Sequence, residues 1–296
     1  MRIGALEAGG TKMVMTVSDE NMRILGRETL PTRTPEETVP GILRFFSDQK
    51  IDALGIGSFG PLDLNPLSST FGNITETPKL AWRHYPLLKT LREKLGVPAA
   101  LDTDVNAAAL CEALTGAAKG LSSCVYLTVG TGIGAGVICN GSLVHGLMHP
   151  EWGHTLLTPH PEDPMPEGIC PYHKGCLEGL ASGPSLEKRW GVPAQALQED
   201  HIGWEIEAHY LAQFCVSALL AISAERIILG GGVMAQRHLF PRIRRETQRL
   251  LNGYLSFAGD MDGLIVPPAR YPDSGMLGAL ILGKRALEEK KKTRNE

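Results

Sequence analysis

The sequence predicts an α/β fold made of two similar halves. Two stretches, residues 3–17 and residues 125–139, share one pattern: a strand leads into a turn of glycine and threonine, and a second strand follows. After each stretch, the spacing of the apolar residues indicates further strands and helices, arranged as in parallel crossovers. We therefore expect a duplicated domain, in which each half carries its own glycine–threonine turn.

The composition is that of an ordinary globular protein. The chain has 296 residues, of which 43% are hydrophobic and 21% charged, with a net charge of −3; this length suits one large or two ordinary domains. No apolar run approaches the roughly 20 residues needed to span a bilayer, and the first residues lack the apolar core of a signal peptide. We expect a cytoplasmic protein with no membrane or nucleic-acid partner. In a reducing compartment its six cysteines should not form disulfides.

The first half begins as a hairpin whose turn, residues 8–12, contains two adjacent glycines and a threonine. Such a turn lets backbone N–H groups approach an anion, although a plain hairpin turn is the alternative. Gly60 follows a predicted strand in a loop rich in Gly and Pro, a usual place for ligand contacts, and Asn73 lies in the next polar segment. We expect strands at residues 3–7, 13–17, 24–29, 53–58 and 98–101, and helices at residues 35–49, 86–95 and 105 to about 119.

The second half repeats the hairpin pattern. Gly130, Gly132 and Ala135 fit the spacing of a dinucleotide fingerprint, but that fingerprint must open a helix and here a strand follows. We therefore reject a Rossmann fold. We expect strands at residues 125–129 and 137–139 around a turn at 130–136, a helix at 205–223, a strand from 226 that ends in glycines 230–232, a helix near 241, an edge strand at 265–269 and a helix of small residues from 273.

Two carboxylates stand where a predicted strand gives way to a helix. In a strand, residues at i and i+2 point to the same side, so Asp102 and Asp104 would share a face. Ligands of open α/β sheets bind at the carboxyl ends of strands, which favours a catalytic role for a carboxylate there. The alternative is that one aspartate only caps the helix that begins near Asn106.

A loop rich in Pro and Gly contains candidate metal ligands: Cys170, His173 and Cys176. Thiolates and imidazole nitrogens are the ligands that zinc prefers, and four of them in a tetrahedron form a structural site. We expect His154 to complete a zinc site, although His149 and His160 are also near in sequence. A surface histidine beside two ordinary thiols is the alternative.

Five motifs occur in one order along the chain: EAGGTK (residues 7–12), DVNAA (104–108), TVGTGIG (128–134), EWGH (151–154) and LGGGV (229–233). In this order they resemble the motifs of ROK-family sugar kinases. Residues 170–184, CPYHKGCLEGLASGP, are most similar to the bacterial zinc-containing fructokinases of that family. One position departs from the family pattern, since many members carry a third cysteine where this chain has His173. The resemblance covers nearly the whole chain.

The resemblance implies an actin-like ATPase (ribonuclease H-like) fold of two α/β lobes with a central cleft. The first lobe would comprise residues 1–107, joined by the C-terminal helix 277–296, and would hold the sugar and one phosphate turn. The second lobe, residues 108–276, would bind the nucleotide and contain the zinc loop.

The resemblance also implies roles for individual residues. Asp104 would deprotonate the sugar hydroxyl, while Asp102 would support the loop or make a secondary metal contact. His154 would bind zinc through one ring nitrogen and a sugar hydroxyl through the other. The expected sugar-binding residues are Gly60, Asn73, Asn106, Glu151, His154 and Glu178. The expected ATP-binding residues are Gly9, Gly10, Thr11, Lys12, Thr131, Gly132, Pro184, Gly231, Gly232, Val233, Met234 and Ala235. The expected zinc ligands are His154, Cys170, His173 and Cys176.

The implied activity is transfer of the γ-phosphoryl group of ATP to a hexose, with Mg²⁺ accompanying ATP and zinc in a structural role. D-Fructose, converted to fructose 6-phosphate, is the expected substrate; glucose, mannose or an N-acetylhexosamine are the nearest alternatives. A sugar-sensing repressor of the family would carry a helix-turn-helix before the first phosphate turn, and Glu7 leaves no room for one. A zinc-stabilised binding protein without catalysis would need a disabled Asp104 or disabled glycine turns. The resemblance further suggests a homodimer.

Overall fold

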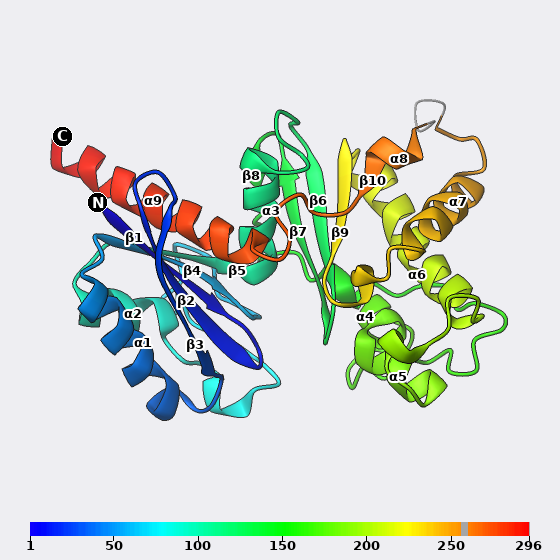
Figure 1. Cartoon of the computed structure of the whole chain (residues 1–296), viewed down its shortest axis with the longest axis horizontal. Helices are drawn as coiled ribbons and strands as arrows, with labels where there is room; N and C mark the ends of the chain where they lie inside the picture. Colours follow the sequence, from blue (N-terminus) through cyan, green and yellow to red (C-terminus); the bar gives the residue numbers. More distant parts are fainter. Residues whose placement is uncertain (256–259, 296) are drawn as a thin grey trace. The chain divides into compact units, whose positions relative to one another are not determined.

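The computed structural model describes residues 1–255 and 260–295, and these form two compact units. Unit 1 comprises residues 1–111, 144–149 and 272–296, and unit 2 comprises residues 112–143 and 150–271. Each unit contains one five-stranded mixed sheet (Figure 1). The short segment 144–149 therefore belongs to unit 1 although unit 2 residues flank it on both sides.

The unit 1 sheet has the strand order β3-β2-β1-β4-β5. The hairpin strands β1 and β2 are antiparallel, as are β2 and β3, whereas β4 is parallel to both β1 and β5. The elements are β1 (Arg2–Ala8), β2 (Lys12–Asp19), β3 (Ile24–Pro31), α1 (Pro35–Gln49), β4 (Ala53–Ser58), the 3-10 turn η1 (Leu80–Trp82), α2 (Leu87–Leu95), β5 (Ala99–Thr103), α3 (Asp104–Thr115, continuing into unit 2) and α9 (Ser274–Asn295).

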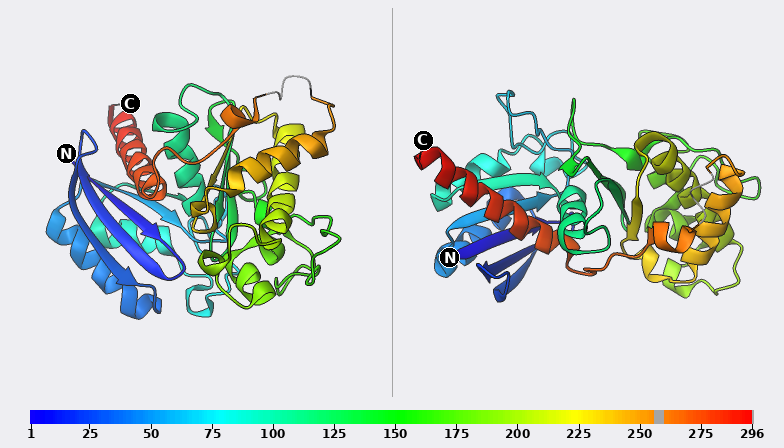
Figure 2. Two further views of the ribbon diagram at one scale, coloured as in Figure 1. Left: turned by 45° about the vertical axis from the view of Figure 1, so that its right-hand side comes forward. Right: turned by 90° about the horizontal axis from the view of Figure 1, so that it is seen from above.

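Side chains alternate between two apolar cores in unit 1, as expected for strands buried on both faces. Leu6 of β1 packs in a core with residues of α1 and α2, whereas Ile3 and Ala5 pack with Ala279 of α9 on the other face. The ribbon views show α9 on one face of this sheet and α1 and α2 on the other (Figures 1 and 2). The helix at the C-terminus thus completes a sheet built from the first hundred residues.

The unit 2 sheet has the order β10-β9-β6-β7-β8. Its hairpin strands β6 and β7 are antiparallel, β7 and β8 are antiparallel, and β9 is parallel to both β6 and β10. The elements are β6 (Cys124–Val129), β7 (Ile133–Cys139), β8 (Ser142–Leu143), η2 (Trp152–His154), α4 (Leu177–Ala181), α5 (Gly183–Trp190), η3 (Ala194–Ala196), α6 (Gly203–Ser217), the π-helical turn η4 (Ala218–Ile222), β9 (Arg226–Gly230), η5 (Val233–Ala235), α7 (Leu239–Leu251), α8 (Met261–Leu264) and β10 (Ile265–Val266).

The two sheets have one topology, which confirms the predicted duplication. In each sheet a three-stranded antiparallel meander is extended by two parallel strands beside the first strand of the hairpin. No helix within the described ranges is long and apolar enough to cross a membrane.

Three predicted boundaries are wrong for local reasons. The strand β7 begins at Ile133 rather than 137, because the turn needs only residues 130–132. Helix α3 ends at Thr115 rather than near 119, because the Glu112 carboxylate accepts the Ala117 N–H at 2.7 Å. The edge strand β10 has only two residues instead of five, since the prolines that follow cannot donate to a neighbouring strand.

Close packing of α9 on β4 gives a stability prediction. A Cβ on Gly55 would overlap the carbonyl oxygen of Ala279, so Gly55→Ala should lower the free energy of unfolding by about 2–3 kcal/mol, measured by urea denaturation. Gly146→Ala is the control, because a Cβ at Gly146 meets nothing within 4 Å. Equal stability of the two variants would contradict this packing.

Candidate functional site

The aspartate stretch forms the junction of a strand and a helix in unit 1. The strand β5 ends at Thr103 and α3 begins at Asp104, so the two aspartates do not share a strand face as predicted. Neither aspartate is the cap that the alternative required. Instead the Thr103 hydroxyl accepts the backbone N–H of Asn106 at 3.0 Å, which is the contact of an N-cap residue.

The Asp104 carboxyl is half-buried at this junction, and its oxygen Oδ1 accepts the Val105 N–H at 2.9 Å. Burial raises the pKa of Asp104 to about 7, the Val105 N–H opposes the shift, and the negative charge of Glu7 adds to it. Burial also raises the pKa of Glu7 itself. A carboxyl that titrates near neutral pH is suited to accept a proton from a substrate hydroxyl.

The first glycine turn connects β1 to β2. Gly9 donates its N–H to the Lys12 carbonyl at 2.9 Å, while Gly10 is partly exposed and Thr11 is exposed. The Lys79 side chain approaches this turn, since a Cβ on Gly10 would lie 3.1 Å from Lys79 Cε. Sequence spacing gave no sign of this lysine, because it comes from a loop nearly seventy residues away.

Besides Asn106, the candidate sugar contacts of unit 1 are Gly60 and Asn73, which lie on two paired loop segments. Gly60 precedes a cis peptide bond to Pro61, and Leu62 forms an isolated bridge with Ile74. Asp63 donates its N–H to the Asn73 carbonyl at 2.9 Å. Tertiary hydrogen bonding therefore places Gly60 and Asn73 on paired segments.

The candidate nucleotide contacts of unit 2 also come together. The exposed Thr131 and the partly buried Gly132 form the turn between β6 and β7. Gly183, which precedes Pro184 at the start of α5, donates its N–H to the Gly130 carbonyl at 2.8 Å. A Cβ on Gly183 would lie 3.8 Å from Val233.

Gly231, in the run of glycines after β9, cannot be replaced by another residue without strain. Gly231 has φ +90, and a Cβ there would overlap the backbone of Val129. Only glycine combines that conformation with so close an approach. The candidates that follow it are Gly232, which is exposed, and Val233, Met234 and Ala235, which form η5.

Glu151, His154 and Glu178 lie close to β7. Gly153 allows this, because a Cβ there would overlap the Ile133 carbonyl oxygen. Glu178, on α4, accepts the Ile133 N–H through Oε2 at 2.9 Å, and its Oε1 is 3.9 Å from His154 Nε2. Glu151 directly precedes η2, which carries His154. The three residues are thus held on adjoining backbone segments.

The four predicted metal ligands converge. The ligand atoms of His154, Cys170, His173 and Cys176 lie within 4.8 Å of one another. His154 Nδ1 is 3.8 Å from both sulfurs, and His173 Nδ1 is 3.7 Å from the Cys170 sulfur. Tetrahedral zinc bonds of the usual lengths place sulfur and nitrogen about 3.6 Å apart, so these donors fit the ion.

The alternative ligands lie elsewhere. His149 belongs to unit 1, where its Nε2 accepts the Leu62 N–H at 3.0 Å. His160 uses Nδ1 to accept the Glu162 N–H at 3.2 Å, and its ring packs against His209. The structure therefore favours His154 as the fourth donor.

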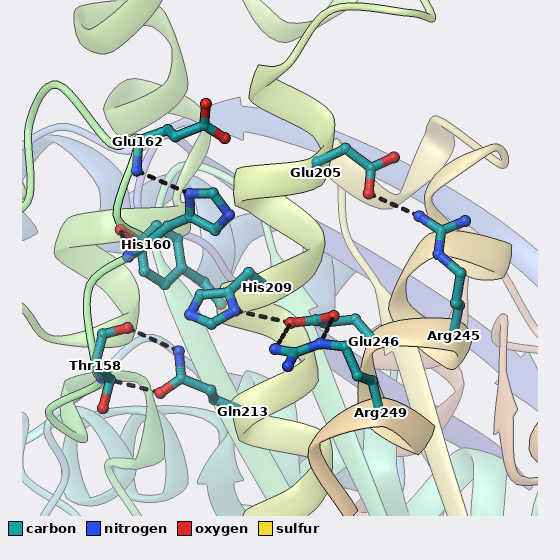
Figure 3. A network of polar contacts seen from close by, with 10 residues as sticks. Thr158, His160, Glu162, Glu205, His209, Gln213, Arg245, Glu246 and Arg249 are labelled. Atoms are coloured by element: carbon teal, nitrogen blue, oxygen red, sulfur yellow. Dashed lines mark hydrogen bonds and ion pairs between the residues drawn. The ribbon is translucent and has the colours of Figure 1, made fainter. Parts of the chain in front are cut away.

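The loop that carries these donors has further anchors on α6, and α6 is in turn held to α7 (Figure 3). Gln213 exchanges two hydrogen bonds of 2.9 Å with the backbone of Thr158. His209 contacts Glu246 at 2.9 Å, and Arg249 binds the same carboxylate through two nitrogens at 2.7 Å. Sequence reasoning missed these contacts because no motif marks them.

Comparisons with known proteins agree with this arrangement. A family model described as the ROK family matches residues 3–286. Fructokinases from Streptococcus mutans and Zymomonas mobilis are 42% and 43% identical, covering 95% and 96% of this chain and 97% and 96% of their own lengths. A solved ROK hexokinase from Thermus thermophilus is 27% identical with a TM-score of 0.78, covering 98% of this chain and 100% of its own. The expected actin-like ATPase fold is thereby confirmed.

The raised pKa of Asp104 predicts a stability effect with a defined sign. Because the folded pKa, about 7, exceeds the unfolded value near ~4, the folded state binds more protons between these values and loses stability as pH rises through them. Asp104→Asn removes this loss. As pH rises from 5 to 8, the free energy of unfolding of the variant should therefore increase by about 2 kcal/mol relative to that of the wild type, measured by urea unfolding.

The control variant should show the opposite dependence of stability on pH. Hydrogen bonds from Ser68 and Thr70 lower the pKa of Asp63, so Asp63→Asn should lose stability at neutral pH relative to acid pH. A stability difference between Asp104→Asn and the wild type that does not change with pH would contradict the raised pKa.

Proposed function

The chain belongs to the ROK family, and from this premise we propose that it phosphorylates a hexose with ATP, converting D-fructose to fructose 6-phosphate. The similarity to fructokinases over nearly the full chain carries this proposal. The half-buried carboxyl of Asp104 at the end of a parallel strand supports it, since phosphoryl transfer to an alcohol needs a base there.

Asp104 accepts the proton of the sugar hydroxyl as that oxygen forms a bond to the γ-phosphorus. The bond between the γ-phosphorus and the bridging oxygen of ADP breaks at the same centre, so the products are a sugar phosphate and ADP. A pKa near 7 keeps Asp104 largely ionised in mildly alkaline solution and basic enough to take the proton.

The glycine turns donate backbone N–H groups to the nucleotide phosphates. Phosphate is bound by the residues of the two turns, which are Gly9, Gly10, Thr11, Lys12, Thr131 and Gly132. The adenosine is flanked by Pro184, Gly231, Gly232, Val233, Met234 and Ala235. Bound Mg²⁺ supplies positive charge that balances the phosphates. Lys79 lies close enough to the first turn to add a cationic contact.

The sugar is bound by Gly60, Asn73, Asn106, Glu151, His154 and Glu178. His154 holds zinc through Nδ1, together with Cys170, His173 and Cys176, and this leaves Nε2 for a sugar hydroxyl or for Glu178. Four protein donors leave no coordination position for water, so bound zinc stabilises the loop and takes no part in the reaction. A homodimer is the assembly we propose, on the basis of the family resemblance alone.

The activity is tested by a coupled ADP-release assay over fructose, glucose, mannose and N-acetylglucosamine. Fructose should give the highest kcat/KM. Asp104→Asn should lower kcat by about 10²–10⁴-fold with little change in the KM for ATP, because a positioned base contributes that factor. The exposed Asp48→Asn is the matched control and should keep wild-type turnover. A higher kcat/KM for another hexose would contradict fructose as the substrate. Wild-type turnover of the Asp104→Asn variant would contradict the role of Asp104 as the base.

Metal analysis tests the zinc site. Purified protein should contain about one zinc per chain, and Cys176→Ser should lose it, with a lower melting temperature or a higher KM for fructose. Cys139→Ser is the control, since Cys139 lies in β7, outside the cluster, and should retain zinc. Protein that contains no zinc when purified without chelators would disprove the site.

A further inference from the structure

Asp102 is buried at the end of β5, with only 6% of its side chain exposed, and makes three hydrogen bonds. Its Oδ1 accepts the Thr103 N–H at 2.8 Å and the Asn106 side-chain amide at 2.7 Å. Its Oδ2 lies 2.9 Å from His145 Nε2. A buried carboxylate with this set of donors is fixed in position on all sides.

These contacts determine the orientation of the Asn106 amide. An ionised carboxylate only accepts hydrogen bonds, so the amide must turn its Nδ2 toward Asp102 and its Oδ1 away. Asn106 is fully buried, and its Oδ1 accepts no hydrogen bond from the described residues. A buried acceptor without a donor is costly, and a hydroxyl of a bound sugar would satisfy it.

His145 reaches Asp102 from a different part of the chain. The segment 144–149 belongs to unit 1, and it is held there at both ends: by His145 on Asp102 and by His149, which accepts the Leu62 N–H. The hydrogen bond to Asp102 raises the pKa of His145, against the effect of burial. The His145 side chain is 38% exposed, so its ring supports the carboxylate from the solvent side.

We propose that Asp102 and His145 form a positioning pair for the sugar site: the contact of His145 with Asp102 Oδ2 fixes the carboxylate whose Oδ1 holds the Asn106 amide, and the Asn106 Oδ1 is left for a sugar hydroxyl. This inference rests on the proposed function, because the ligand of Asn106 is the sugar. It assigns His145 a role that no sequence motif indicates. Because the pair acts through Asn106, we expect the effect to fall on sugar binding rather than on chemistry.

Steady-state kinetics of three variants test the pair. His145→Ala should raise the KM for fructose about tenfold, since hydrogen bonds to charged groups have about this effect on affinity, with kcat and the KM for ATP within about threefold of the wild type. His145→Gln should restore most of the affinity, because its amide can donate at the position of Nε2. Asp102→Asn should impair fructose binding at least as strongly, since an amide there can turn Asn106 around.

Glu76→Gln is the matched control, because Glu76 pairs with His84 at 2.9 Å on the exposed surface of the same unit. It should leave every constant unchanged. The proposal is overturned if His145→Ala keeps the wild-type KM for fructose. It is also overturned if His145→Ala and His145→Gln lower thermal stability equally and change the KM for fructose no more than the KM for ATP.

A second readout does not depend on the substrate. In the wild type, NMR titration should show the His145 imidazole protonated to a higher pH than an ordinary histidine, near ~6.5, and Asp102→Asn should abolish the difference. If the pKa of His145 is that of an ordinary histidine while the protein phosphorylates fructose, the positioning pair is disproved and the proposed function stands. A raised His145 pKa in a protein that does not phosphorylate fructose would support the contact and remove the proposed substrate.

Discussion

The unit 1 site depends on the partial burial of the Asp104 carboxyl where β5 meets α3. Removing a carboxylate from water without an ion-pair partner raises its pKa, and a folded protein keeps such a group only when the surrounding structure compensates for its cost. Here the compensation is local: Thr103 caps the helix, and Val105 donates its N–H to Asp104. The strand end and the helix start are therefore fixed together with the carboxyl group that we propose as the base.

The duplicated topology explains why similar turns occur in both units. In each sheet the first strand of the hairpin lies in the centre, paired on one side with its hairpin partner and on the other with a parallel strand. A turn that leaves such a strand is held by hydrogen bonds on both sides of the strand. This rigidity suits the exposed Thr11 and Thr131 for contacts with phosphate groups.

The loop that carries the metal donors combines two kinds of restraint. The side chains of His154, Cys170, His173 and Cys176 come together within the loop, whereas Gln213 and His209 attach the loop to helix α6, which follows it in the sequence. The buried ion pair of Asp163 with Arg189 at 2.8 Å adds a third attachment, and Tyr210 donates to the same carboxylate. A loop with little apolar core of its own thus gains a fixed conformation from polar contacts.

The sequence by itself determined the α/β class, the duplication, most strands and helices, and three of the four candidate metal donors, because these depend on local periodicity, turn residues and the spacing of ligand types. The fourth donor, His154, was selected over His149 and His160 only by the structure. Local spacing left Asp102 and Asp104 equivalent, and only the family resemblance distinguished them. The tertiary packing supplies the physical difference: Asp102 is buried among hydrogen-bond donors, whereas burial raises the pKa of Asp104 to about 7. The contact of His145 with Asp102 and the approach of Lys79 to the first turn were equally hidden. Each joins residues about forty or more positions apart, and no local pattern encodes the chain path that brings them together.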